Sequence, residues 1–67
     1  MWITIKDYII NFDNIKMIKK GKDPYDPVLI LYFCGSESAQ IISFKNENER
    51  DCVFMDIEKI LAKNKNI

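Results

Sequence analysis

The stretch that decides the fold is Val-Leu-Ile-Leu-Tyr-Phe-Cys at positions 28–34, seven apolar residues without a polar interruption. It lies between Pro27 and Gly35, two residue types that are common in turns. A run this short, with β-branched and aromatic members, favours a strand over a helix. Alternate side chains of a strand point to opposite faces, which separates Val28, Ile30, Tyr32 and Cys34 from Leu29, Leu31 and Phe33. Both faces are apolar, so the sequence predicts that both need cover.

Four further strands and one helix are predicted around this stretch. The strands lie at about residues 2–6, 8–12, 15–20, 28–34 and 39–45, and the helix covers about residues 47–63. Lys6-Asp7 fits a tight turn between the first two strands. Strict alternation fails at Met17-Ile18, which predicts a β-bulge there, with a single helical turn as the alternative. Two prolines and two aspartates within residues 21–27 predict a loop.

The predicted helix has start signals and an apolar stripe. Asn46 fits the N-cap position, and Glu49 follows three residues later, as in a capping box. The stripe at helical spacing consists of Val53, Phe54, Ile57, Ile60 and Leu61. We expect residues 64–67 to fray beyond the helix end.

These elements predict an α+β fold in a single domain spanning residues 1–67. Sequential strands with short connections pair as antiparallel neighbours, giving a curled antiparallel sheet of four to five strands with the C-terminal helix packed across it. One helix covers one face of such a sheet. The second face then needs either a rolled-up sheet or a second molecule. A core of this size contributes only roughly 3–5 kcal/mol, which favours a homo-oligomer.

Composition and charge exclude several classes of protein. Ten basic and ten acidic side chains give zero net charge, so no global field attracts nucleic acid or anionic lipid. Cys34 and Cys52 are too few for a disulfide scaffold and are predicted to be reduced core residues. Lys6 and Asp7 interrupt the apolar start, and no apolar run is long enough to span a membrane, so we expect a cytoplasmic protein.

The sequence contains no constellation typical of catalysis, metal binding or cofactor binding. Histidine is absent, so neither cysteine has the base that would activate it as a nucleophile. The acidic side chains of the predicted helix are typical of a solvated face, and we expect no catalytic residue and no enzyme activity. Asp23 and Asp26 do not have the spacing of a calcium loop, and two glycines form no phosphate-binding loop. We therefore expect no metal and no cofactor.

One basic cluster is present, formed by Lys16, Lys19, Lys20 and Lys22 and flanked by Tyr25. Such a cluster can hold an anionic ligand or single-stranded nucleic acid. Lysines also protect edge strands from aggregation, and the neutral total charge favours that interpretation. A third possibility is that these lysines meet the acidic helix start of a neighbouring copy.

Four aromatic residues are the predicted partner contacts, because aromatic side chains are enriched as interface anchors: Trp2, Tyr8, Tyr25 and Tyr32. Of these four, Tyr25, in the proline-bounded loop, is the residue that we most readily assign to contact with a protein partner. The alternative is that it folds back over the sheet.

The segment Tyr8-Ile9-Ile10-Asn11-Phe12-Asp13-Asn14-Ile15 resembles small bacterial and phage proteins in which a short hairpin leads into an Asn-rich turn and a three-stranded meander. The layout of several strands followed by one C-terminal helix is similar to the FlbD/SwrD group of short flagellar accessory proteins. The resemblance covers most of the chain in layout. It implies a small non-enzymatic accessory protein and no particular site residue.

The sequence thus predicts a small non-catalytic binding module that acts by protein–protein contact, as a homo-oligomer or with an unidentified protein partner. Its many Ile, Lys and Asn residues are typical of AT-rich coding in a bacterium, a phage or another mobile element. In a phage setting such a module can act in the host cytoplasm, where it would inhibit a host defence complex by covering one of its surfaces. The alternatives are a sponge for an anionic small molecule or nucleotide at a subunit interface, and nucleic-acid binding through Lys16, Lys19 and Lys20.

Overall fold

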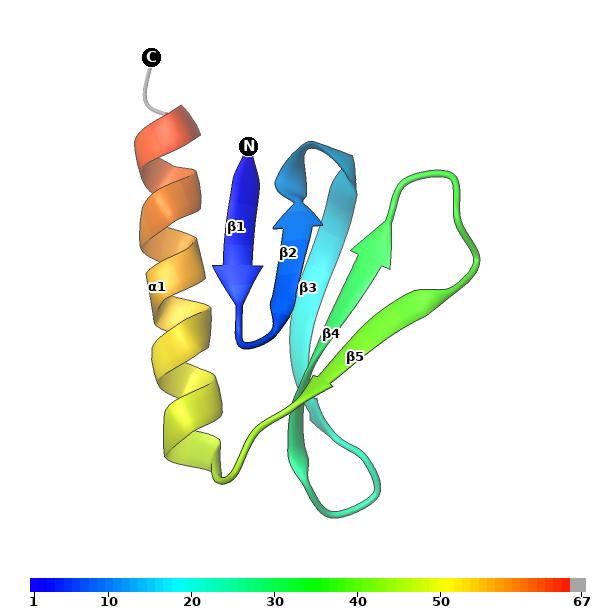
Figure 1. Cartoon of the computed structure of the whole chain (residues 1–67), viewed down its shortest axis with the longest axis vertical. Coiled ribbons are helices and arrows are strands. Elements are labelled where there is room, and N and C mark those ends of the chain that lie inside the picture. Colours follow the sequence, from blue (N-terminus) through cyan, green and yellow to red (C-terminus); the bar gives the residue numbers. More distant parts are fainter. Residues whose placement is uncertain (66–67) are drawn as a thin grey trace.

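A computed structural model describes residues 1–65 of the chain (Figure 1). The strands are β1 (Trp2–Ile5), β2 (Tyr8–Asn11), β3 (Ile15–Lys22), β4 (Pro27–Phe33) and β5 (Ala39–Ser43). A 3-10 turn, η1 (Phe12–Asn14), joins β2 to β3, and the helix α1 (Glu47–Lys65) follows β5. The predicted α+β fold with antiparallel strands and a C-terminal helix is confirmed. Residues 66 and 67, part of the predicted fraying end, lie outside the described residues, and the helix includes the other two, Asn64 and Lys65.

The strands form two antiparallel sheets where the sequence predicted one. β1 pairs with β2, and the second sheet has the order β3-β4-β5. The 3-10 turn separates the two sheets, because its three residues redirect the chain between β2 and β3. Asn11 caps this turn through its side-chain oxygen, which accepts a 3.0 Å hydrogen bond from the Asp13 amide. Asp13 and Asn14 therefore lie where the hairpin ends and the second sheet begins.

The first hairpin turns at Lys6-Asp7, as the sequence predicted. Ile3 lies opposite Ile10, and Ile5 lies opposite Tyr8. Lys6 has a φ of 54°, a left-handed conformation that costs an L-residue free energy and that glycine adopts readily. The turn contains no glycine, so Lys6 carries the backbone strain.

The second sheet contains the predicted β-bulge. The register shifts between Ile15, which lies opposite Phe33, and Met17, which lies opposite Tyr32. The extra residue is therefore Lys16, close to the predicted position, and the alternative of a single helical turn is wrong. β3 also extends to Lys22, opposite Pro27, so the first residues of the predicted proline loop belong to the strand.

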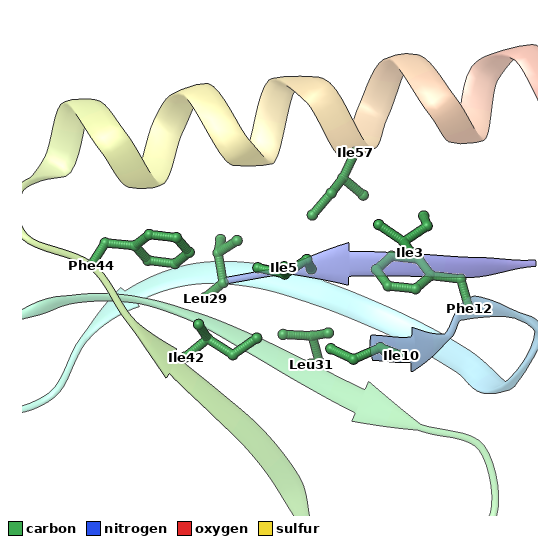
Figure 2. Close-up of a cluster of buried hydrophobic side chains, with 9 residues drawn as sticks. All are labelled: Ile3, Ile5, Ile10, Phe12, Leu29, Leu31, Ile42, Phe44 and Ile57. Carbon is green, nitrogen blue, oxygen red and sulfur yellow. The ribbon is translucent and has the colours of Figure 1, made fainter. Parts of the chain in front are cut away.

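The core lies between the two sheets and the helix (Figure 2). The central strand contributes Leu29 and Leu31, which have no exposed surface. The remaining buried apolar side chains come from the first hairpin, η1, β5, the segment after it and the helix: Ile3, Ile5, Ile10, Phe12, Ile42, Phe44 and Ile57. The hairpin and α1 together thus cover the face of β4 that carries Leu29 and Leu31.

The helix begins where the sequence predicted. The Asn46 side-chain oxygen accepts a 2.8 Å hydrogen bond from the Glu49 amide, so Asn46 is the N-cap. The Glu49 carboxylate accepts a 3.3 Å bond from the amide of Lys45, one residue before the position of a standard capping box. Ile57 is the most buried member of the predicted stripe, and Ile60 remains 37% exposed.

Candidate functional site: two apolar surfaces on the three-stranded sheet

The outer face of the three-stranded sheet points away from the core. We define it by nine strand positions that share one side in the observed register: Met17, Lys19 and Gly21 on β3, Val28, Ile30 and Tyr32 on β4, and Ala39, Ile41 and Ser43 on β5. This is the second apolar face that the sequence predicted for the central strand. Lys19 is the one charged residue among the nine.

Large apolar side chains on the outer face remain in contact with solvent. Met17 is 47% exposed and Ile41 is 42% exposed, while Ile30 and Tyr32 between them are half-buried. Val28 is fully buried. A Cβ atom at Gly21 would lie 3.2 Å from Ile30 Cδ1 and 3.7 Å from Val28 Cγ2, so these two side chains fill the space above the glycine. The outer face is therefore packed at one end and open around Met17 and Ile41.

A groove lies beside β3, between its bulged start and the C-terminal half of α1. This helix–strand groove has a volume of about 370 Å³. Its lining is mainly apolar and consists of Phe12, Ile15, Lys16, Met17, Ile18, Phe54, Ile57, Glu58 and Leu61. Met17 belongs to both the groove and the outer face, so the two apolar surfaces meet at this residue.

The groove lining includes one cation and one anion, Lys16 on the bulge and Glu58 on the helix. Both residues are exposed. Among residues 1–63, whose side chains the structure describes, neither of them takes part in an ion pair. The groove therefore offers an occupant an apolar surface with one unpaired charge of each sign.

The predicted basic cluster is divided by strand alternation. Lys20 and Lys22 lie on the side of β3 that faces the helix, where Lys22 Nζ is 3.1 Å from Glu47 Oε2 and Lys20 Nζ is 3.7 Å from Asp51 Oδ1. Lys20 also lies 5.2 Å from the centre of the Phe54 ring. Lys19 lies on the outer face, and Lys16 lines the groove. The four lysines therefore do not converge on one anion, and two of them contact the acidic helix start of their own chain.

The four predicted contact aromatics are dispersed as well. Tyr25, in the loop between β3 and β4, is 87% exposed, and Trp2 on the outward side of the first hairpin is 68% exposed. Tyr8 is 43% exposed and lies beside the hairpin turn, opposite Ile5. Tyr32 is the only one of the four on the outer face. Tyr25 does not fold back over the sheet.

Both cysteines are free and exposed, so the prediction that they are core residues is wrong. Cys34 follows the last residue of β4, on the side of the outer face, and Cys52 lies next to the apolar helix stripe but outside it. In the described chain, no group of three or more Cys, Asp or Glu side chains is placed to hold a metal ion. No helix among the described residues is long and apolar enough to cross a membrane.

Arg50 links the helix to β3 next to Gly21 of the outer face, and it was not predicted from the sequence. Its side chain is the one buried charged residue of the described chain, at 8% exposure. The guanidinium donates from Nη1 to the Gly21 carbonyl oxygen at 3.0 Å and from Nε to Asp51 Oδ1 at 3.0 Å. Its position, four residues before Phe54 and seven before Ile57, places it in line with the buried stripe, and that spacing was the available signal.

At the free edge of β5, side chains donate hydrogen bonds to some of the backbone carbonyl groups. Phe44 N donates a 2.9 Å hydrogen bond to Pro27 O. Because backbone groups along an antiparallel strand alternate between pointing toward and away from the paired strand, the N–H and C=O groups of Ile41 and Ser43 point away from β4. Gln40 Nε2 donates to Ile41 O at 3.3 Å, and Lys6 Nζ donates to Ser43 O at 2.7 Å. Because two outward carbonyls already have donors, the edge is a poor template for an added strand.

Comparison with known protein families, with curated proteins and with solved structures finds no match to this chain. The function of the chain is therefore inferred from the two surfaces described above.

Proposed function

We propose that this chain is a non-catalytic protein-binding module that holds a partner protein on the outer face of its three-stranded sheet. The observation that carries the proposal is the exposure of Met17 and Ile41 at 47% and 42% on a face where Lys19 is the one charge. Apolar surface gathered on one face costs free energy in water, and monomeric proteins seldom keep large contiguous patches without a use.

The charge of the outer face favours a different protein over a second copy. Two copies packed face to face would place two Lys19 ammonium groups in one interface without a carboxylate from the same face. A partner with an apolar centre and an acidic rim would bury Ile41 and Met17 and pair with Lys19. In a bacterial or phage setting, a module of this kind would inhibit a host complex by covering the surface that it binds.

A sponge for a nucleotide or another anion, or a nucleic-acid binder, is the weaker candidate. Lys20 and Lys22 are paired with carboxylates of the helix, and Lys16 and Lys19 lie on different surfaces. These candidates predict nucleotide absorbance at 260 nm in the purified protein, or binding to an oligonucleotide that weakens steeply with salt. The protein-binding proposal predicts neither result.

The proposal is tested by placing a photo-crosslinking amino acid at Ser43 and, separately, at Thr4. Both positions are exposed, but Ser43 lies on the outer face and Thr4 on the outward side of the first hairpin. After illumination in the cells that produce the protein, we expect one defined protein adduct from Ser43 and none from Thr4. Ile41→Glu should reduce that adduct strongly, because it places a carboxylate in the apolar contact.

The control is a circular dichroism spectrum and urea midpoint for Ile41→Glu, which should show the wild-type fold and a midpoint only slightly lower, because Ile41 is exposed and lies outside the core. Absence of an adduct at Ser43 would contradict the proposal. The same adduct from Thr4 and Ser43 would do so as well, because it would indicate contact without a preferred face.

A further inference from the structure

We propose that the helix–strand groove is a self-association surface, in which two copies of this chain dock by a two-fold axis through reciprocal Lys16–Glu58 contacts. This surface meets the outer face used by the proposed partner protein at Met17 and otherwise consists of different residues. A chain of 67 residues with a small core gains stability from a second copy, which supplies a general reason for such a surface.

The groove provides the apolar part of the contact. Phe54 and Leu61 on the helix and Ile15 on β3 are only partly buried where they line it. Met17 stands at the border of the groove and is 47% exposed. Its unbranched, flexible side chain can fit an irregular apolar space, so Met17 of each copy is the side chain that would enter the groove of the other.

The charges identify the occupant. In a two-fold interface both copies use the same surface. If Lys16 of the first copy contacts Glu58 of the second, then Lys16 of the second copy contacts Glu58 of the first, so the contact occurs twice. A surface that carries one cation and one anion, both unpaired in the described chain, is complementary to a second copy of itself. An anionic or a cationic ligand would satisfy only one of the two charges. The outer face, with Lys19 alone, has no such self-complementarity.

Charge exchange tests the proposal directly. The dissociation constant of the dimer is measured by analytical ultracentrifugation for the full chain and for Lys16→Glu, Glu58→Lys and the double variant. Each single variant creates like-charge contacts twice per dimer, so we expect the dissociation constant to rise about tenfold or more. The double variant restores opposite charges with their places exchanged and should return the constant close to that of the wild type.

Lys19→Glu and Asp56→Lys are the matched controls. They make the same changes of charge on the same strand and the same helix, at residues that do not line the groove. We expect both controls to dimerise like the wild type. A monomeric wild type, equal effects of controls and groove variants, or a double variant no better than the singles would each overturn the proposal. Because Ile41→Glu alters only the outer face, failure of self-association and failure of partner binding are distinguishable.

Discussion

Lys6 Nζ donates a 2.7 Å hydrogen bond to the carbonyl oxygen of Ser43, a residue 37 positions later in the chain. The same ammonium group lies 5.2 Å from the centre of the Phe44 ring. The turn of the first hairpin is thereby tied to the edge of the second sheet. Since the two sheets share no ladder, this contact is a polar link between them that does not depend on strand pairing.

Lys6→Met is expected to weaken this link and to lower the free energy of unfolding by about 0.5–1 kcal/mol, because it removes the charged donor and keeps the aliphatic stem. Lys6→Gly removes the donor too, but it also relieves the positive φ, which is worth roughly 1 kcal/mol. We therefore expect Lys6→Gly to be more stable than Lys6→Met in urea unfolding. Equal stability of Lys6→Met and the wild type would show that the link contributes nothing.

Arg50→Met is expected to lower the free energy of unfolding by about 1–3 kcal/mol. The methionine fills part of the buried space but cannot donate to Gly21 O or to Asp51, and hydrogen bonds from a charged donor are worth about that much. Urea unfolding followed by circular dichroism measures the change. Asn48→Ala, an exposed position two residues earlier on the helix, serves as the control and should change stability little. An Arg50→Met protein as stable as the control would contradict this role.

Lys19 and Lys20 are adjacent in sequence but lie on opposite sides of β3. We therefore expect their substitutions to have different effects on the free energy of unfolding. Lys20→Met loses the contacts with Asp51 and the Phe54 ring, and we expect a loss of about 0.5–1 kcal/mol that becomes smaller as salt is added. Lys19→Met makes the outer face more apolar and should leave stability unchanged. The measurement is the urea midpoint at low and at high ionic strength. Similar midpoints for the two variants would refute the distinction.

Leu31→Ala should remove most of the free energy of unfolding at room temperature. Leu31 has no exposed surface, and a buried Leu→Ala change costs about 2–5 kcal/mol. The whole core of a chain this small supplies only roughly 3–5 kcal/mol. Ile41→Ala, on the neighbouring strand but on the outer face, should cost less than about 1 kcal/mol. Thermal unfolding followed by circular dichroism compares the two, and similar losses would mean that the outer face is packed as tightly as the core.

Local patterns in the sequence predicted the elements well. The apolar run of the central strand, the Asn46 cap and the failure of alternation before Ile18 each depend on residues close together in the chain. Such features are dictated by side-chain periodicity and short-range hydrogen bonds, which a sequence displays directly. The alternation of the central strand also separated Leu29 and Leu31 from the residues of the outer face.

Contacts between distant segments could not be predicted in the same way. Lys20 and Lys22 appeared as part of a free basic cluster, and only the position of the helix pairs them with Asp51 and Glu47. The groove requires the bulge and the second half of α1 to lie side by side, which no local pattern specifies. Cys34 was assigned to the core because it ends an apolar run, yet alternation places it on the open side of the sheet.

The polar links between α1 and β3 in the described chain all lie in the first turns of the helix, at Glu47, Arg50 and Asp51. The half of the helix that borders the groove contacts β3 through apolar side chains, which impose no fixed direction. A small tilt about the anchored end would move Leu61 farther than Arg50. The angle of the helix would therefore set the width of the groove, and the packing of Ile57 in the core limits how far that angle can change.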